Sequence, residues 1–185
     1  MPNIIKNVLK IKNLKQEEID IVLNLLTSPA TIPTDPIEKT EYVIDFDKII
    51  PEPRTIEDCS PEFRIPEEKR DKPGIEITDD RNWFDWYTWR VHYWGTKWGA
   101  YDAYTEIGKS YIIFVFNTAW SYPEPIIDKL HLLGYELEYR YADEDIGNNC
   151  GRITYSSKQG WDIQNDDTHS LSSPRNFARR LWEKY

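Results

Sequence analysis

Residues 82–104 read NWFDWYTWRVHYWGTKWGAYDAY, and they hold five of the eight tryptophans of the chain together with Phe84 and four tyrosines. On a helix over residues 83–94, at about 100° per residue, the large apolar side chains sort onto one face. That face holds Trp83, Phe84, Tyr87, Val91 and Trp94, with Trp86 and Tyr93 at its edge. Aromatic side chains bury about 150–250 Å² each. We therefore expect this helix to be the main element packed against a sheet.

Four residues of this stretch are candidates for binding. Arg90 falls in the middle of the apolar face. There it either stacks on indole rings and pairs with a carboxylate such as Asp102, or meets an anionic ligand. Trp89 falls between the two faces, so it either anchors a protein partner or packs under the acidic insertion (residues 54–80). Lys97 and Trp98 follow the helix in a predicted exposed turn and would extend such a binding surface.

Periodicity around the aromatic helix predicts further strands and helices. Strands are predicted over residues 7–12, 42–46, 100–107, 111–116, 135–141 and 152–156, and helices over residues 15–26, 123–133 and from Pro174 onward. The order is β-α-β, insertion, α, β(β), α, β-β, α, and its late hairpin breaks the parallel pattern. This order favours an α+β fold, a two-layer sandwich with an antiparallel sheet of the split βαβ kind and helices on one face.

The length of 185 residues suits one compact domain, or two small lobes that share a core. We divide the chain into an N-terminal β-α-β part (residues 1–53), an acidic, proline-rich insertion (residues 54–80) and a C-terminal part with the aromatic helix (residues 81–185). The first and last parts are expected to form one compact unit. The net charge of −9 makes duplex DNA a poor ligand, because phosphate contacts need a basic surface.

The two cysteines, Cys59 and Cys150, lie far apart and lack a CxxC spacing. A disulfide framework, a zinc site or an iron–sulfur centre is therefore not expected, and we predict no cofactor and no metal. The first residues, MPNIIKNVLKIKN, have lysines among their apolar residues, unlike a signal peptide. No run approaches the ~18 apolar residues of a membrane span. We expect a cytoplasmic protein with no membrane contact.

Most of the negative charge lies in one segment. Residues 41–80 carry thirteen acidic and six basic side chains, a balance of −7. The carboxylate clusters there are Asp45 with Asp47 and Glu57 with Asp58. A loop of this length is either a surface insertion of no special chemistry or a partner-binding arm. A metal site would need further oxygen ligands at close spacing, and no EF-hand pattern is present.

Asp143, Glu144 and Asp145 form the densest carboxylate cluster of the C-terminal part. Such carboxylates could do acid–base work or hold magnesium, but acidic residues followed by Gly147 are also typical of a solvated hairpin turn. The three histidines are scattered, and the sequence has neither a nucleophile elbow nor a phosphate-binding glycine loop. The sequence therefore favours a protein without catalytic residues.

Several motifs together resemble one family. They are MPNxxxNxLxIxN at the start, DFDKIIPEP at residues 45–53, NWFDWYTWRVHYWGTKWGAYD at residues 82–102, FNTAWSYPEP at residues 116–125 and YADEDIGNNCG at residues 141–151. The chain resembles the ferredoxin-like (YubB- and Api-type) proteins carried by phages, prophages and plasmids. The resemblance implies a ferredoxin-like C-terminal half and a mobile-element origin. The family has no established activity, so no catalytic residue is carried over. Asn13 stands where the family usually has a glycine, a change confined to a turn.

Three functions stay open at this point. The favoured one is a non-enzymatic phage or mobile-element accessory protein that binds a macromolecular partner, a host or phage protein. One form of it is a counter-defence inhibitor whose acidic surface occupies the basic groove of a host nucleic-acid-binding enzyme. The second is an enzyme or small-molecule binder with a pocket beside the aromatic helix, where Arg90, Asp102 and residues 143–145 converge. The third is a single-stranded nucleic-acid binder that stacks bases on Trp89 and Trp98.

Overall fold

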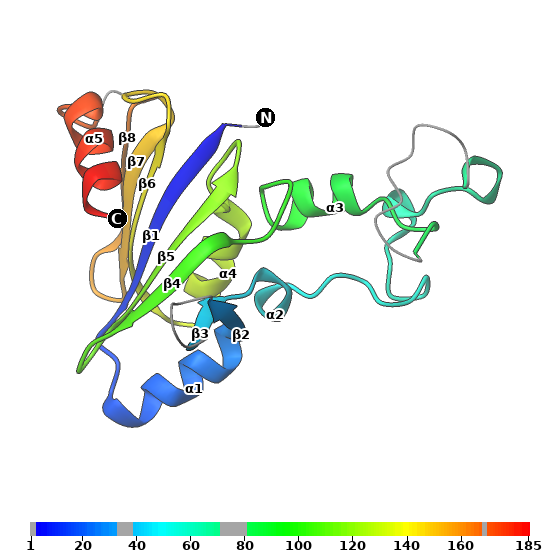
Figure 1. Ribbon diagram of the computed structural model, residues 1–185, viewed down its shortest axis with the longest axis horizontal. Coiled ribbons are helices and arrows are strands. Elements are labelled where there is room, and N and C mark those ends of the chain that lie inside the picture. Colours follow the sequence, from blue (N-terminus) through cyan, green and yellow to red (C-terminus); the bar gives the residue numbers. More distant parts are fainter. Residues whose placement is uncertain (1–2, 33–38, 71–80, 168–169) are drawn as a thin grey trace.

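The computed structural model describes residues 3–32, 39–70, 81–167 and 170–185. Six strands form one antiparallel sheet in the order β4-β5-β1-β6-β7-β8 (Figure 1). These strands are β1 (Ile4–Lys12), β4 (Tyr101–Ile107), β5 (Ile112–Ala119), β6 (Glu136–Asp143), β7 (Cys150–Ser156) and β8 (Gly160–Asn165). The α-helices are α1 (Gln16–Leu26), α2 (Phe46–Ile49), α3 (Trp86–Tyr93), α4 (Glu124–Leu132) and α5 (Pro174–Lys184). A separate hairpin joins β2 (Thr27–Ile32) to β3 (Lys39–Ile44).

The centre of the sheet is built from two interleaved β-α-β units. The first is β1, α1 and β4, and the second is β5, α4 and β6. β1 lies between β5 and β6, so the N-terminal strand occupies the middle of the sheet. This is the predicted split βαβ arrangement. The residues between α1 and β4 form a long insertion into the first unit. β7 and β8 extend the sheet beyond β6 of the second unit, and α5 follows them in the chain.

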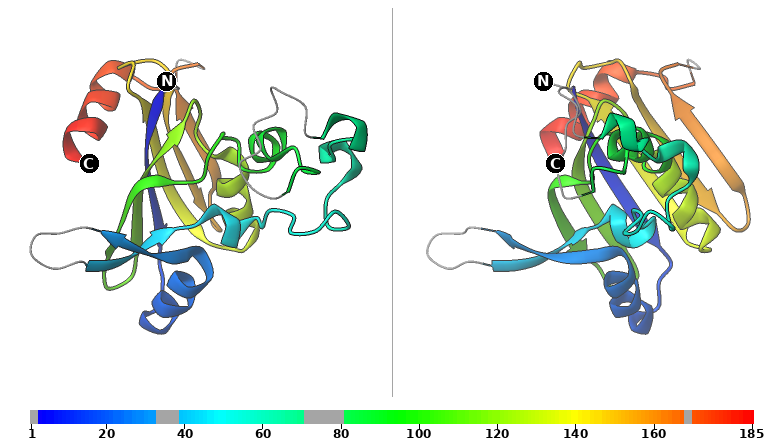
Figure 2. Two further views of the ribbon diagram at one scale, coloured as in Figure 1. Left: turned by 45° about the vertical axis from the view of Figure 1, so that its right-hand side comes forward. Right: turned by 90° about the vertical axis from the view of Figure 1, so that its right-hand side faces the viewer.

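Each face of the sheet has its own apolar cluster. Successive side chains of a strand point to opposite faces. Leu9 and Phe114 therefore belong to the cluster with α1 and α4, whereas Val8 and Val115 pack with Leu181 of α5. In this respect the structure differs from the expectation that helices cover one face only: α5 covers the second face (Figure 2). The reason is β5, which is apolar on both sides and buried along its whole length.

Residues 50–70 and 81–94, here called the arm, project away from the sheet (Figures 1 and 2). The arm contains the short 3₁₀ helices η1 (Pro61–Phe63) and η2 (Glu67–Lys69) and then α3. Two main-chain hydrogen bonds tie its parts together: Ile65 N–H donates to Trp83 O (2.7 Å), and Asp85 N–H donates to Phe63 O (2.9 Å). Residues 54–70 of the predicted insertion are thus folded against the segment before α3, while residues 71–80 lie outside the described part.

The aromatic helix is shorter than predicted and buries a different face. α3 begins at Trp86 because the Asp85 carboxylate accepts a main-chain N–H of the first turn (3.1 Å). Trp86 and Trp89 are buried, whereas Tyr87 and Val91, predicted to be buried, are 41% and 42% exposed. The predicted face assumes a helix that lies against the sheet. Instead α3 contacts α4 and η1, so a different stripe faces the interior.

A buried polar network links the central strands. Asn7 is fully buried in β1, and its side-chain amide donates to Ile5 O and to the Thr118 hydroxyl, both at 2.9 Å. The hydroxyl of fully buried Tyr139 donates to the Asn7 side-chain oxygen. The network satisfies polar groups that would otherwise weaken the core. It also fixes the strand register, because its members come from β1, β5 and β6.

Three neighbouring tyrosines make the fold sensitive to alkali. Burial, followed by the charge of Glu124, raises the pKa of Tyr122 to about 12, and burial raises the pKa values of Tyr139 and Tyr141 above their usual range. An exposed phenol ionises near pH 10, at about its value in the unfolded chain. Because folding favours the neutral phenols, their contribution is complete below that pH and is lost as the pH rises through the folded-state pKa values.

We therefore expect the melting temperature to be steady up to about pH 9 and to fall steeply between about pH 10 and 12. Thermal unfolding at stepped pH, with tyrosinate absorbance recorded in parallel, tests this. Titration of all tyrosines near pH 10, without loss of structure, would contradict the burial of this cluster.

Candidate functional site

The predicted partner-binding carboxylates divide into two pairs. Asp45 accepts the N–H of Asp47 as the cap of α2, and Asp47 accepts the main-chain N–H of Glu52 at 2.7 Å. These two side chains therefore hold the turn after β3. Glu57 and Asp58 are exposed on the arm. Of the two pairs, only Glu57 and Asp58 are exposed, as a partner-binding acidic surface requires.

Arg90 is held between two indole rings, as the structural alternative predicted, but its carboxylate partner is Glu52. The guanidinium carbon lies 5.1 Å from the ring centroid of Trp86 and 5.0 Å from that of Trp94. Glu52, which is 4% exposed, forms ion pairs with Arg90 and with Arg81 (3.2 Å). This network joins the two chain segments of the arm. Asp102, the predicted partner, does not take part in it.

The residues predicted to converge on Arg90 have partners elsewhere. Asp102, at the start of β4, accepts a hydrogen bond from the Asn117 amide at 3.2 Å. Asp143 is 4% exposed at the end of β6, where it accepts the Asp145 N–H at 2.8 Å. The solvated-turn interpretation therefore holds for Glu144 and Asp145, which are exposed, but is wrong for Asp143. None of these carboxylates shares a hydrogen-bond partner with Arg90 in the described part of the chain.

Trp89 is not the exposed anchor that its helical position suggested. It is 4% exposed and packs against Phe84, Tyr93 and Trp94. It also lines a small cavity together with Arg54 and Asp58, so the structure supports the alternative of packing under the predicted insertion. Trp98, in contrast, is 38% exposed. Base stacking on both tryptophans is therefore ruled out in this conformation, and Trp98 alone keeps the predicted exposure.

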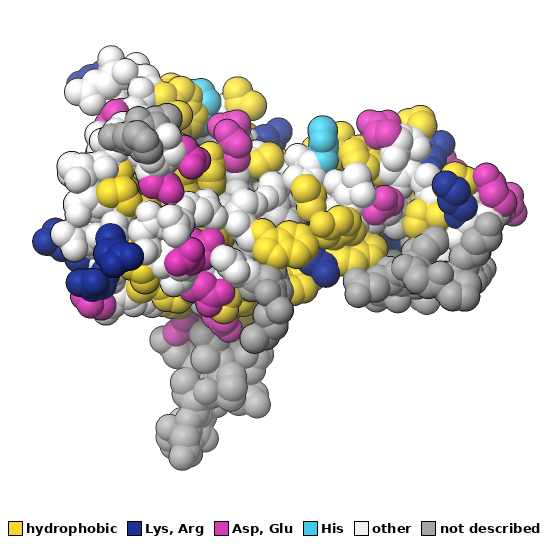
Figure 3. All heavy atoms as spheres, turned by 90° about the horizontal axis from the view of Figure 1, so that it is seen from above, with side chains coloured by type: hydrophobic (Ala, Val, Ile, Leu, Met, Phe, Trp, Pro, Cys, Tyr) yellow, Lys and Arg dark blue, Asp and Glu magenta, His cyan; other side chains and the backbone are white. Residues whose placement is uncertain are grey.

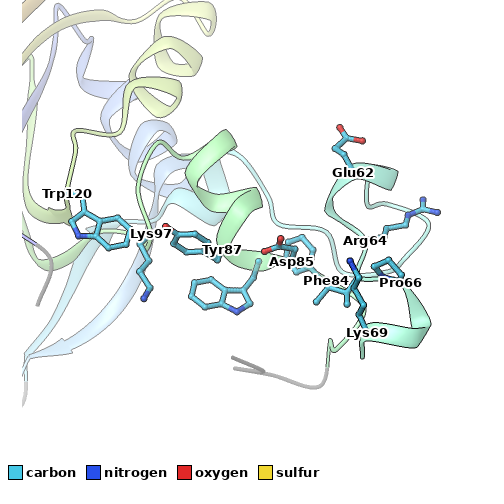
Figure 4. A pocket seen from close by; sticks show the side chains of 11 residues that line it. Glu62, Arg64, Pro66, Lys69, Phe84, Asp85, Tyr87, Lys97 and Trp120 are labelled. Carbon is cyan, nitrogen blue, oxygen red and sulfur yellow. The ribbon is translucent and has the colours of Figure 1, made fainter. Parts of the chain in front are cut away.

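A cavity of about 570 Å³ opens between the two segments of the arm and the end of β5. Figure 4 shows Trp120, Lys97 and Tyr87 at one end and Arg64, Pro66 and Lys69 at the other. Its lining residues are Glu62, Arg64, Ile65, Pro66, Lys69, Phe84, Asp85, Trp86, Tyr87, Lys97 and Trp120. From outside, apolar side chains gather at the junction of the arm and the sheet (Figure 3). We call this cavity the aromatic pocket.

Lys97 lies among four aromatic rings at one end of the aromatic pocket. Its ammonium nitrogen is 5.1 Å from the ring centroid of Trp98, 5.8 Å from those of Tyr87 and Trp120, and 6.0 Å from that of Trp86. These distances lie within the range of cation–π attraction. Within the described residues, no carboxylate forms an ion pair with Lys97. The cation is therefore held by one buried ring, Trp86, and three partly exposed ones.

Trp120 is held in this position by an unusual backbone conformation. Its φ is +70°, in the left-handed region that bulky residues rarely adopt. Its N–H donates to Asn3 O (2.9 Å), and its carbonyl accepts the Asn149 side-chain amide (3.1 Å). Despite this fixed backbone, the indole is 43% exposed. Strain at an exposed aromatic residue points to a role in binding, because packing does not repay it.

The turn that carries Lys97 is fixed to the same strand end. The buried Thr96 hydroxyl donates to Ala119 O at 2.9 Å and accepts the Ala119 N–H at 3.2 Å. Gly95 has a φ of +77°, and a Cβ there would lie 2.8 Å from Pro125 Cδ. Only glycine fits this close approach between the turn and the start of α4. The turn and β5 thus place Lys97 next to Trp120 without help from the arm.

The aromatic pocket combines cations with flat rings. Arg64, Lys69 and Lys97 line it, and none of them forms an ion pair with a carboxylate among the described residues. Of its two carboxylates, Asp85 is occupied as the cap of α3, while Glu62 is exposed at the rim. Such a site can bind by stacking, by cation–π contact and by pairing with an anion.

Sequence reasoning identified Lys97 and Trp98 but missed Tyr87 and Trp120. Tyr87 was assigned to the buried face, and Trp120 was read as part of a turn. The sequence did contain one signal for Trp120: it follows a buried strand directly and lies in a turn, where a large aromatic side chain is not expected to be buried. Tyr87 was missed because the predicted helix buries the face that carries it, whereas α3 buries another face.

No three His, Cys, Asp or Glu side chains of the described residues group in a way that could hold a metal ion. None of the helices in the described segments has the length and apolar character that crossing a membrane would need.

Comparison with known families agrees with the topology. Residues 94–183 match the family model of the ferredoxin-like domain in Api92-like protein. The match covers β4 to β8, α4 and most of α5, but not α3. It includes Lys97 and Trp120, which line the aromatic pocket, and Trp98 next to Lys97. No match to the chain was found among curated proteins or among solved structures. The fold class is confirmed: residues 94–183 are similar to the ferredoxin-like domain of Api92-like proteins, and in this chain β1 completes the sheet between β5 and β6.

Proposed function

We propose that this protein is a non-enzymatic binding protein that holds a segment of a partner protein in the aromatic pocket. The observation that carries the proposal is the strained, exposed Trp120 beside Lys97 and two further partly exposed rings, Tyr87 and Trp98. Tryptophan, tyrosine and arginine are the residues that most often dominate binding energies at protein interfaces. A rigid strand end that displays them in a cavity is pre-organised for such contacts.

The chemistry of the aromatic pocket favours an acidic segment as its occupant. Lys97, Arg64 and Lys69 line it without ion-pair partners among the described residues, and one of its two carboxylates is used as a helix cap. A carboxylate placed at Lys97, or at Arg64 and Lys69 on the opposite end, would gain charge-assisted hydrogen bonds. An apolar or aromatic side chain next to it would stack on Tyr87 or Trp120. The partner is thus an acidic segment with a neighbouring large side chain.

A finer form of the proposal places the protein on a phage or other mobile element, in the cytoplasm of a bacterial host, as a counter-defence inhibitor. It draws on the resemblance to phage- and plasmid-borne proteins and on the net charge of −9. The described carboxylates give it limited support, because Asp45, Asp47 and Glu52 are used within the fold. In the described part of the arm, charge mimicry would rest on its exposed carboxylates, which are Glu57, Asp58, Glu62, Glu67 and Glu68.

A small-molecule ligand is the second candidate, favoured by the size of the aromatic pocket. Ligand sites commonly enclose about 300–1,000 Å³ with aromatic walls and a few polar groups, and the volume here is about 570 Å³. The ligand would carry an anionic group and a flat ring. This candidate does not depend on the convergence of Arg90, Asp102 and Asp143.

The test uses Trp120→Gly. Glycine relieves the backbone strain, by about 1–2 kcal/mol, while losing ring contacts worth about 0.5–1.5 kcal/mol. We therefore expect an almost unchanged melting temperature and at least a tenfold loss of partner binding. The measurement is quantitative capture from a lysate of the organism that carries the gene, followed by titration with the captured partner.

The matched control is Trp161→Ala, because Trp161 in β8 is as exposed as Trp98, at 38%, and lies outside the aromatic pocket. It should bind as the unchanged protein does. Equal capture by the Trp120 variant would contradict the proposed site. Capture of no protein, with loss of a bound small molecule in the Trp120 variant, would favour the second candidate.

A further inference from the structure

A second cavity, of about 480 Å³, lies beside α5, the helix that covers the second face of the sheet. We call it the α5 groove. Its polar lining consists of Arg140 of β6 together with Ser172, Ser173, Asn176, Arg180 and Lys184. The last three repeat every fourth residue and so share one side of the helix. From Ser173 to Lys184 the helix rises about 16 Å, so the groove is elongated.

The α5 groove is basic although the protein is acidic. Three of its lining side chains are cationic and none of its described lining residues is Asp or Glu, against a net charge of −9 for the chain. Figure 3 shows Lys and Arg side chains gathered at the end of the molecule where α5 lies. Cations concentrated on one concave surface raise the local concentration of anions there.

Arg140 supplies a weakly paired cation at the wall of the α5 groove. Its Nε atom is buried and has no hydrogen-bond partner, and the nearest carboxylate oxygen, from Glu138, lies 3.7 Å away. That distance is beyond hydrogen-bond range. The guanidinium carbon lies 5.8 Å from the ring centroid of Tyr185. The Arg140 side chain is 26% exposed, so its cation, paired only at long distance with Glu138, can meet an anion in the groove.

The start of α5 adds donors at the other end of the groove. Ser173 is the N-cap residue, yet its hydroxyl makes no capping hydrogen bond. The first-turn amides therefore keep their partial positive charge. Together with the side chains of Ser172 and Asn176, they give the groove donors along its whole length. An anion with one charge would use one end, whereas a chain of anions would use both.

We propose that the α5 groove binds single-stranded nucleic acid through successive phosphates. Guanidinium groups match phosphate in a bidentate geometry, and the partly exposed rings of Phe177 and Tyr185 line the same groove for base stacking. A concave groove bounded by a helix and a sheet admits one extended strand. It excludes a duplex, a convex rod that needs a broad basic face. This site is separate from the aromatic pocket.

The experiment measures fluorescence anisotropy of a labelled thymidine oligonucleotide of about eight nucleotides, a length typical of single-strand sites. Three phosphate contacts predict a slope of about −2 for log K against log salt concentration. The variant Arg180→Gln with Lys184→Gln removes two of them, so the slope should fall to about −0.7. We expect at least a tenfold loss of affinity at low salt.

The control is Lys109→Gln with Lys129→Gln, which changes the net charge by the same amount at exposed positions outside the groove. It should retain the affinity. Circular dichroism confirms that each variant is folded.

The inference would be overturned by the absence of binding at the lowest salt, or by equal losses of affinity in the two double variants. It would also be overturned if a duplex bound as tightly as the single strand, or if an acidic peptide with the same concentration of negative charges displaced the oligonucleotide. A protein that binds inorganic pyrophosphate but does not bind the oligonucleotide would overturn it too, because the groove would then be a site for a small anion.

Discussion

Replacing Phe46 by alanine is expected to lower the free energy of unfolding by about 4 kcal/mol, in the range of buried phenylalanine truncations. Phe46 is 1% exposed at the start of α2. Its ring makes edge-on contacts with Trp94 (6.0 Å between centroids) and Phe116 (5.7 Å). It therefore joins β5, α2 and the end of α3. Removing it leaves a cavity at the point where the arm meets the sheet.

Urea denaturation followed by circular dichroism measures this effect. The control is Leu132→Ala on α4, where the side chain is 76% exposed and truncation should change stability by less than about 0.5 kcal/mol. A loss below about 1 kcal/mol for the Phe46 variant would show that the arm and the sheet do not share this core.

Replacing Glu52 by alanine is expected to cost about 3 kcal/mol. Glu52 is 4% exposed and pairs with Arg81 and Arg90, whose side chains are 18% and 23% exposed. Breaking a buried ion pair costs about 3–5 kcal/mol because the remaining charge loses its partner. The lower end applies here, since both arginines can still reach water. The loss should be concentrated in the arm, because all three residues hold its segments together.

Two measurements separate this local effect from general destabilisation. Urea denaturation gives the total loss, and limited proteolysis should show faster cleavage within residues 50–70, with the sheet still protected. Glu57→Ala, an exposed carboxylate of the same arm, is the control and should leave both results unchanged. An equal effect of the two substitutions would mean that the Glu52 network does not stabilise the arm.

The aromatic pocket depends on the packing of Phe46 and on the ion pairs of Glu52. The Phe46 contact fixes where the arm leaves the sheet, and the Glu52 network holds Arg90 between Trp86 and Trp94. Trp86 is also part of the ring set around Lys97. Loosening the arm should therefore weaken partner binding at a distance, while Trp120 and Lys97 stay on the rigid strand end. Partner titration with the Glu52 variant measures this coupling.

The sequence alone was sufficient for the five strands β1, β4, β5, β6 and β7 of the main sheet, but not for β8 or for the separate hairpin of β2 and β3. Residues 135–141 alternate between apolar and polar side chains, as in a strand with one buried face, and residues 111–116 are apolar throughout, as in a strand with two buried faces. Such patterns can be read from the sequence of the strand itself. The order of strands and helices then left few topologies, and the split βαβ arrangement is the observed one. The exposed turn with Lys97 and Trp98 was also predictable, because it directly follows the glycine that ends the helical pattern.

The tertiary structure alone decided the site. A helical pattern with aromatic residues on nearly every side has no unique phase, so Trp89 and Tyr87 exchanged their expected exposures once Asp85 fixed the start of α3. The partner of Arg90 is Glu52, which lies thirty-eight residues earlier in the chain. Trp120 joined Lys97 only because β5 ends beside the turn after α3. Local patterns encode burial along one element, whereas a pocket is made by contacts between elements distant in sequence, and these arise only when the chain packs.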